Sequence, residues 1–481
     1  MKKAFILTAI LFIFAASVAV FTACGSSEEA TKYTIKAVYD AENRLLDADM
    51  TVHYVNDGDA LDSVYFHLYP ASYREGARFA PITEDDVGAA YPNGISYGGI
   101  TIENVTVGGE NVPWEIGGED ENMLIVNTAV DGGKSADIGI SFTVNVPEVR
   151  HRLGYADGVL NLGNWYPIAA VYENGAFRCD PYYSNGDPFY SETADYDVEL
   201  TLPSGWEAAG SGSVTTTLSG DVSVFEFTAE NVRDFAICAS AGFTCVEGEQ
   251  DGVKIRFYGN PLQAENGLVI AKDAVRTFSE LFGQYPYATY SVAVTPFTEG
   301  GMEYPALAYI SSDMTGSLFA ETIVHETAHQ WWYAAVGNDQ INNAWMDEGL
   351  AEYSTTLFYE HNPSYGVTAE DRIADAMQSF VLFSEVYGGS EGFGRMDRAL
   401  GEYSTATEYA FHAYVKGELM FDTVRHVIGD DAFLKALRAY YKEYSGKTAT
   451  PDALIAAFEE ASGLQLADFM ESWISGEAAV N

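Results

Sequence analysis

Four residues in the middle of the chain have the types and the spacing that bind a metal ion and use it in catalysis. His325 and His329 are four residues apart, so in a helix their imidazoles lie on one face and can bind the same cation. Glu326 stands beside the first histidine, where a carboxylate can take a proton from water. Glu348 is well placed to supply a third ligand. Two histidines, one glutamate and an open fourth position are typical of catalytic zinc.

Two helices must hold these residues. The first is predicted to begin at Ser317, a candidate N-cap, and to continue until Gly337, because apolar residues recur at helical spacing between them. The second is predicted to run from about 343 to 361, because Pro363 prevents a longer helix. This arrangement brings the third ligand to the two histidines from a separate helix.

Three motifs resemble those of the membrane alanyl aminopeptidase family of gluzincin metallopeptidases, and they follow one another along the chain in that family's order. The zinc residues just described have that family's spacing. Upstream, Gly300-Gly301-Met302-Glu303-Tyr304 is similar to the family's Gly-x-Met-Glu-Asn exopeptidase motif, with Tyr304 where Asn is usual. Downstream, Tyr414-Val415-Lys416-Gly417 is similar to the family's Tyr-Glu-Lys-Gly. The resemblance covers most of the chain and is strongest from about 255 to 475.

The resemblance implies a role for each motif residue. It implies one zinc ion per chain as cofactor, with Glu326 as general base. It implies that Tyr414 donates a hydrogen bond to the oxygen on which negative charge develops. Glu303 is expected to bind the free amino group of a peptide. Gly300, Gly301 and Met302 are expected to bind the substrate as well, since bare glycine backbone lets an extended strand pair along it.

The sequence also departs from the family, and two acidic residues leave their roles open. The family's N-terminal domain often binds the substrate amine through a second residue near a Pro-Cys-x-Asp-Glu-Pro segment, which this chain lacks. The corresponding region is expected between Asn164 and Pro181. Asp347 and Glu352 either support the zinc-binding side chains or are exposed helix carboxylates.

The N-terminal residues have the pattern of an export signal. Lys2 and Lys3 precede an apolar run from 4 to 23. The segment Phe21-Thr22-Ala23-Cys24-Gly25 resembles a bacterial lipoprotein signal, which implies that residues 1–23 are removed, that Cys24 is lipidated and that residues 24–30 form a tether. An uncleaved membrane anchor is the alternative. Both interpretations place the catalytic part outside the cytoplasm, attached to a bacterial membrane.

Charge and cysteine content exclude some classes of partner and fold. The chain has 25 basic and 70 acidic residues, a net charge of −45. This disfavours nucleic acid as a partner and electrostatic docking on anionic lipid. Apart from Cys24, only Cys179, Cys238 and Cys245 are present, which is no disulfide framework. Cys238 and Cys245 could pair if they lie on neighbouring strands.

The chain is predicted to have an α+β fold with two domains. Residues 31–246 contain alternating strands and turn signals and are predicted to form an antiparallel β domain, with a hairpin turn at Asn56-Asp57-Gly58. Residues 71–98 are irregular and are predicted to be a surface excursion. Residues 247–481 mix a few strands with many helices. The resemblance implies that they form a thermolysin-like, mainly helical zinc catalytic domain, in a short two-domain form of the family.

The leading functional hypothesis is a zinc metallopeptidase that removes N-terminal residues from short peptides. A zinc endopeptidase, which does not need a free amine, is the nearest alternative. A surface binding or sensor lipoprotein that has lost catalysis is the alternative from another class.

Overall fold

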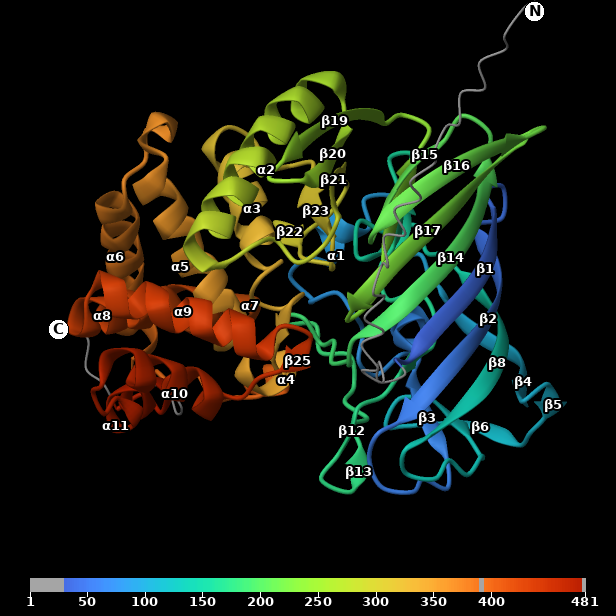
Figure 1. Ribbon diagram of the computed structural model, residues 1–481. Helices are drawn as coiled ribbons and strands as arrows, with labels where there is room; N and C mark the ends of the chain where they lie inside the picture. The colour runs from blue at the N-terminus through green and yellow to red at the C-terminus, as the bar shows by residue number, and fades with distance from the viewer. Residues whose placement is uncertain (1–29, 389–392, 478–481) are drawn as a thin grey trace, which may run out of the picture.

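A computed structural model of the protein describes residues 30–388 and 393–477; the predicted signal segment and Cys24 lie outside these residues. Figure 1 shows a β-rich half and a helical half side by side. We call residues 31–243 the β half and residues 244–477 the helical half. The predicted α+β class is confirmed.

The β half is built on one large sheet. Its strands are β1 (Lys32–Asp40), β2 (Leu45–Asn56), β4 (Gly99–Val107), β5 (Glu110–Asn111), β8 (Lys134–Asn145), β14 (Ala194–Pro203), β16 (Ser213–Ser219) and β17 (Val222–Val232). They lie in the order β16-β17-β14-β1-β2-β8-β4-β5. Buried and exposed residues alternate strictly along β1, so one face of the sheet is core. All neighbours are antiparallel except β1 and β14, which are far apart in sequence and pair in parallel.

Shorter strands complete the β half. They are β3 (Val64–His67), β6 (Trp114–Gly117), β7 (Met123–Val126), β9 (Leu153–Ala156), β10 (Val159–Leu162), β11 (Ile168–Ala169), β12 (Tyr172–Glu173), β13 (Ala176–Phe177), β15 (Glu207–Gly210) and β18 (Ile237–Ser240). The hairpin predicted at Asn56 is wrong. The Asn56 side chain accepts a hydrogen bond from the Gly58 N–H at 3.1 Å, and this turn carries the chain from β2 to β3 in a different sheet.

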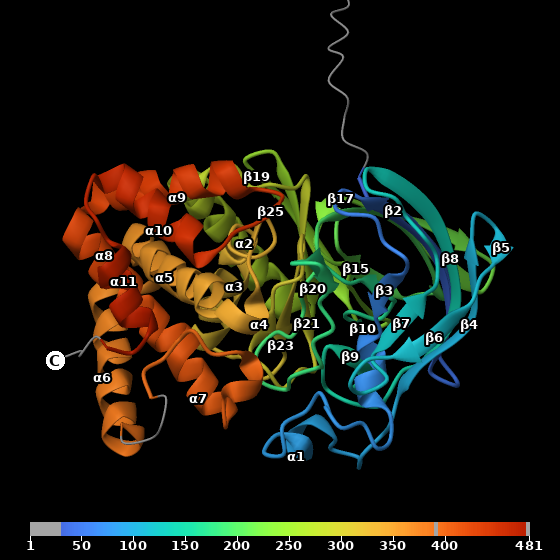
Figure 2. The same ribbon diagram turned by 90° about the horizontal axis from the view of Figure 1, so that it is seen from below.

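The predicted excursion leaves the sheets of the β half and reaches the junction with the helical half. It begins in a 3-10 helix, Tyr69–Tyr73, and contains the short helix α1 (Val87–Ala90). Arg74 donates to Asp120 at 2.6 Å, and the Arg150 N–H donates to the Ala90 carbonyl at 3.0 Å, so the excursion is anchored at both ends. In Figure 2, α1 lies beneath the junction of the two halves.

A five-stranded sheet begins the helical half. Its strands are β19 (Thr244–Gln250), β20 (Val253–Gly259), β21 (Thr289–Thr295), β22 (Gly301–Met302) and β23 (Leu307–Ser311), in the order β19-β20-β21-β23-β22. The three central strands are parallel, and β22 is an antiparallel edge strand. The domain boundary expected between 246 and 247 falls inside β19, so the division at that residue stays a prediction.

Helices make up most of the remaining chain. They are α2 (Pro261–Phe282), α3 (Ser317–Ala328), α4 (Gln340–Asn343), α5 (Trp345–His361), α6 (Ala369–Tyr387), α7 (Ala406–Ala410), α8 (Lys416–Ile428), α9 (Asp430–Tyr444), α10 (Pro451–Ser462) and α11 (Ala467–Ile474). A π-helix, Phe411–Val415, joins α7 to α8, and β24 (Val336–Gly337) pairs in parallel with β25 (Lys447–Thr448). Within residues 30–388 and 393–477, no helix has the length and apolarity needed to span a bilayer.

The first zinc helix is shorter than predicted. It is capped by Gly316 and ends at Ala328, with His329 as its C-cap, rather than continuing to Gly337. The two tryptophans that extended the helical pattern are anchored in different directions instead. The Trp331 indole N–H donates to the Gly283 carbonyl and that of Trp332 donates to Ser354, both at 2.9 Å, so tertiary packing outweighs local periodicity. The second zinc helix, α5, agrees closely with its predicted range.

The described cysteines are free thiols. Cys238 lies on β18 and Cys245 on β19, which belong to different sheets. The Cys238 thiol donates to the Asn161 side-chain oxygen at 3.3 Å. The pairing of Cys238 with Cys245 that the sequence left open is therefore not made in this structure.

Candidate active site

The three predicted ligands meet where the end of α3 faces the start of α5. The Nε2 atoms of His325 and His329 are 3.0 Å apart. Oε2 of Glu348 lies 3.3 Å from the first and 3.1 Å from the second. All three side chains are buried. Because α3 ends at Ala328, His329 lies at the helix terminus and turns its imidazole toward α5.

The donor set fits a zinc ion. Ligands about 2.0–2.1 Å from zinc in a tetrahedron are about 3.3 Å from one another, close to the separations observed. The Nδ1–H of His325 donates to Glu352 at 2.9 Å, and that of His329 donates to the Trp332 carbonyl at 3.0 Å. Both Nε2 lone pairs therefore face each other and the Glu348 carboxylate. Such buried, converging lone pairs need a cation between them.

Glu326 occupies the same cleft without being one of these three donors. Burial raises the pKa of its carboxyl to about 7, within the range of a general base at neutral pH. A Cβ atom on Gly301 would lie 2.3 Å from Glu326 Oε1, so glycine is needed there to make room for this carboxylate. At Gly300 the nearest atom to an added Cβ is 4.0 Å away, on Thr322. The two glycines thus differ in how closely they constrain the base.

Two buried carboxylates line the cleft beside the ligands, one from each half. Glu303 accepts a hydrogen bond from Gln340 at 3.1 Å, and Asp187 accepts one from Arg152 at 2.6 Å. Burial, followed by the charge of Asp187, raises the pKa of Glu303 well above its usual value. Burial also raises the pKa of Asp187. Buried carboxylates that repel each other favour a cationic group between them.

Tyr414 reaches the ligands from the π-helix. Its hydroxyl donates to Glu348 Oε1 at 2.5 Å, and its ring stacks on the His325 imidazole with centroids 5.7 Å apart. The Tyr409 hydroxyl donates to the same Glu348 oxygen at 3.4 Å. Burial raises the pKa of Tyr414 well above its usual value, so the phenol stays a neutral donor. One wide π-turn at this point is a feature common at functional sites.

The residues on either side of Glu303 tie the motif to the β half. Met302 is fully buried, its sulfur accepts a hydrogen bond from Arg152 at 3.3 Å, and it does not line the cleft, so its contact with a substrate stays a prediction. The Tyr304 hydroxyl donates to Asn164 at 3.3 Å. A Cβ on Gly163 would lie 1.9 Å from that hydroxyl oxygen. Tyr304 therefore fills a space in the β half that is shaped to receive it.

Several residues around the site were missed or left open by the sequence. Asp187 belongs to no motif, and its place in the cleft becomes visible only when the two halves pack together. Glu352 is not an exposed helix carboxylate, because it accepts from His325. Asp347 is buried as well and accepts from Asn338 at 2.8 Å and from Gln340 at 2.6 Å. Glu352 thus supports a predicted zinc ligand, whereas Asp347 is linked through Gln340 to Glu303.

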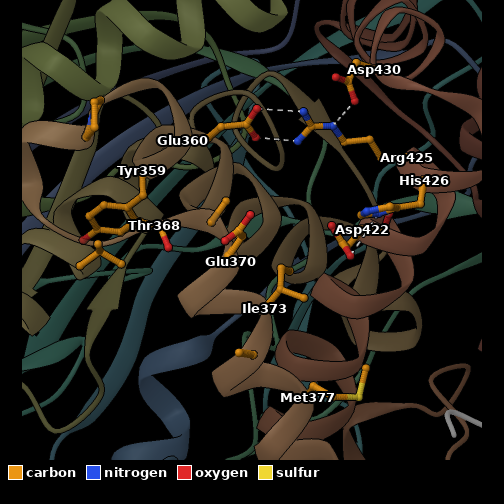
Figure 3. Close-up of a pocket in the computed structure, with 14 residues that line it drawn as sticks. Tyr359, Glu360, Thr368, Glu370, Ile373, Met377, Asp422, Arg425, His426 and Asp430 are labelled. Atoms are coloured by element: carbon orange, nitrogen blue, oxygen red, sulfur yellow. Dashed lines mark hydrogen bonds and ion pairs between the residues drawn. The ribbon is translucent and has the colours of Figure 1, made fainter.

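The ligands open into a cleft of about 390 Å³ between the two halves, with the wall from the β half formed in part by Thr83 and Asp86 of the excursion. A larger cavity of about 930 Å³ lies beyond the far end of α5, at α6 and α8. Figure 3 shows that the carboxylates of Glu360 and Asp430 there are bound to Arg425. The metal donor set and the candidate base lie in the smaller cleft, which is therefore the candidate active site.

Comparison with known proteins agrees with this location. A model of the peptidase family M1 domain matches residues 268–473, which include all three motifs. Aminopeptidase N of Lactobacillus delbrueckii subsp. lactis is 24% identical over 404 residues, covering 78% of this chain and 46% of its own length. Aminopeptidase N of Lactococcus lactis subsp. lactis is 27% identical over 260 residues, covering 48% and 30%. The chain spans less than half the length of these curated relatives.

Solved structures share the fold over almost the entire chain. The M1 zinc metallopeptidase from Deinococcus radiodurans superposes with a TM-score of 0.70 at 18% identity, covering 94% of this chain and 95% of that one. A variant of that protein bound to a Tyr-Ser-Ala substrate has a TM-score of 0.67 with the same identity and coverage. The arrangement of a β-rich half and a helical half is therefore that of M1 zinc metallopeptidases.

Proposed function

We propose that this protein is a zinc-dependent aminopeptidase that releases N-terminal residues from short peptides. The observation that carries the proposal is the convergence of His325, His329 and Glu348 beside two buried carboxylates in one cleft. The names of the curated relatives and the match to the M1 domain support it. Zinc held by these ligands would polarise the substrate carbonyl and lower the pKa of a water, so that hydroxide would be available at neutral pH.

The residues of the chain then have distinct tasks in hydrolysis. Glu326 takes the proton from the attacking water and delivers it to the departing amine. Tyr414 now donates to Glu348; a turn of its hydroxyl toward the substrate would place a donor at the oxygen on which negative charge grows. Edge strand β22 offers backbone groups to an extended peptide.

Specificity for the N-terminus rests on Glu303 and Asp187. The positive ammonium group of a peptide would balance the negative charge of these two carboxylates. Arg152 neutralises Asp187 only in part, because the same guanidinium also lies 3.8 Å from Glu299. The hydrogen-bond donor to Glu303 is the neutral side-chain amide of Gln340. An endopeptidase would gain nothing from two buried anions beside its metal, which favours the aminopeptidase over that alternative.

A surface binding or sensor lipoprotein remains the alternative without catalysis. Loss of chemistry usually removes the base, a ligand or the donor tyrosine. All of these are present, with Glu326, Glu348 and Tyr414 in one cleft. The intact set supports an enzyme.

We also propose that the protein works outside the cytoplasm, held to a bacterial membrane by lipid on Cys24. The support is the N-terminal sequence, with its basic start, apolar run and cysteine. Mass spectrometry of the membrane fraction tests this: a lipid-modified N-terminus at Cys24 is expected, and an intact Met1 in that fraction would instead indicate an uncleaved anchor.

The activity is tested on protein that begins at Gly25, with matched peptides bearing free or acetylated N-termini, with and without a zinc chelator. Cleavage of only the free-amine peptides, lost on chelation, is the expected result. Cleavage of acetylated peptides would assign an endopeptidase. No cleavage of either by zinc-loaded protein would favour the binding protein.

A further inference from the structure

Behind the zinc ligands, one arginine lies among three carboxylates. Arg372, on α6, has a side chain only 8% exposed. It forms an ion pair with Glu321, donates to Glu352 at 2.7 Å, and lies 3.7 Å from Glu418. Its Nε–H donates to the Thr356 hydroxyl at 2.8 Å. The guanidinium is therefore fixed from several sides, and none of these contacts is to a zinc ligand.

One of the three carboxylates connects Arg372 to the metal donors. Glu352 accepts from Arg372 on Oε1 and from the His325 Nδ1–H on Oε2 at 2.9 Å. With both oxygens held, the carboxylate keeps one orientation. That orientation puts the proton of His325 on Nδ1 and leaves the Nε2 lone pair for the metal.

Without the arginine, this orientation would not persist. Glu321, Glu352 and Glu418 would then lie close together with no cation among them and would repel one another. Glu352 would turn away from its neighbours and from His325. A lysine would restore the charge, but it lacks the planar fork that reaches several acceptors at once.

We infer that Arg372 is a positioning residue that holds Glu352 against His325 and thereby sets the affinity of the site for zinc. This inference rests on the proposed function, because it assumes that the three ligands bind zinc. It adds a residue from outside every motif, on a helix that carries none of the ligands.

The test is zinc affinity in the full-length protein, measured by competition with a chromogenic chelator. Arg372→Gln is expected to weaken zinc binding about 10- to 100-fold, as loss of a group that orients a metal ligand does. Arg372→Lys is expected to recover part of that loss. Cobalt-substituted protein gives a second readout: Arg372→Gln is expected to change the visible absorption of the bound cobalt.

The matched control is Arg425→Gln. Arg425 is also an arginine held by two carboxylates, with Glu360 at 2.7 and 3.0 Å and Asp430 at 2.9 Å, and it has no link to a ligand (Figure 3). The substitution Arg425→Gln is expected to lower the melting temperature without weakening zinc binding. Equal weakening in both variants would overturn the inference, since it would show a general effect of lost stability.

A double substitution tests whether Arg372 affects the zinc site through Glu352. If Arg372 acts through Glu352, adding Arg372→Gln to Glu352→Gln should weaken zinc binding little further. Fully additive losses would overturn the inference. The inference would also be overturned if the parent protein binds zinc and both Arg372→Gln and Arg372→Lys bind it with an affinity within about twofold of the parent's. A parent protein that binds no zinc would instead overturn the proposed function.

Discussion

The two halves of the molecule contribute to one cleft in different ways. The helical half supplies the metal donors and the base from α3, its C-cap and α5, between His325 and Glu348. The β half supplies Asp187 and Arg152, which belong to no motif and to no regular element. The metal donors and the candidate base are thus encoded over a short stretch of sequence, whereas the carboxylates that we propose select the substrate come together only when the halves pack.

The same contrast holds for the contacts that fix the ligand helices and the Gly300–Tyr304 motif. The ligand helices are fixed by their own contacts, such as Trp332 with Ser354. The exopeptidase motif is fixed by the β half, through Met302 with Arg152 and Tyr304 with Asn164. Changes in the helical half should therefore affect turnover, and changes at the junction should affect which peptides are cleaved.

The largest effect is expected from the base. Glu326→Gln removes the proton acceptor, and turnover should fall roughly 10³-fold or more while zinc content is unchanged. Steady-state kinetics and metal analysis of the purified variant measure both. Glu265→Gln, an exposed site on α2, is the matched control and should behave like the parent. Turnover that survives in Glu326→Gln would remove this residue from the mechanism.

A smaller loss is expected from crowding the base. Gly301→Ala would place a Cβ within 2.3–2.6 Å of three Glu326 side-chain atoms, so the carboxylate must move. A displacement of this size should lower kcat about 10²-fold. Gly300→Ala meets nothing closer than 4.0 Å and should keep most of the activity. Equal kcat values for the two variants would mean that the position of Glu326 does not depend on Gly301.

Substitutions at Glu303 and Asp187, the carboxylates that we propose bind the substrate amine, compare the two halves directly. Glu303→Gln should reduce the preference for free over acetylated peptides about 10- to 100-fold, mainly through KM. Asp187→Asn should reduce it less, because part of its charge is already balanced by Arg152 at 2.6 Å. Competition between matched peptides measures the preference. A larger effect at Asp187 would make the β half the main determinant of exopeptidase specificity.

The metal donors and their helices were predictable because their signals are local. The spacing of His325, His329 and Glu348 needs no tertiary information, and α5 ends close to where Pro363 requires. The end of α3 was not predictable, because the two tryptophans after His329 keep the helical pattern while distant partners hold them.

Tertiary contacts likewise explain the other differences. Asn56-Asp57-Gly58 has a hairpin composition, but the next strand pairs in another sheet. The hydrogen bonds of the π-helix that carries Tyr414 span one residue more than those of an α-helix, a difference that apolar spacing over so short a segment does not reveal. Asp187 was missed because its significance comes from Arg152 and Glu303, both distant in sequence.

The smallest expected effect is on how strongly the stability of each half depends on acid pH. Burial lowers the pKa of His67 in the β half and of His412 in the helical half to about 4 in each case. The unfolded chain, with a histidine pKa near 6.5, binds more protons than the folded one between these values. Stability therefore falls as pH drops from 6.5 toward 4.

For each histidine, the loss of unfolding free energy between pH 7 and pH 5 amounts to roughly 2 kcal/mol. His67→Phe preserves ring stacking on Tyr69, with centroids 5.0 Å apart in the parent, and cannot titrate. The substitution His67→Phe should remove the acid sensitivity of β3 while leaving that of the π-helix, where His412 accepts a hydrogen bond from the Gly394 N–H. Hydrogen exchange at pH 7 and pH 5 resolves the two elements. An unchanged pH difference at β3 in His67→Phe would assign the acid sensitivity to other groups.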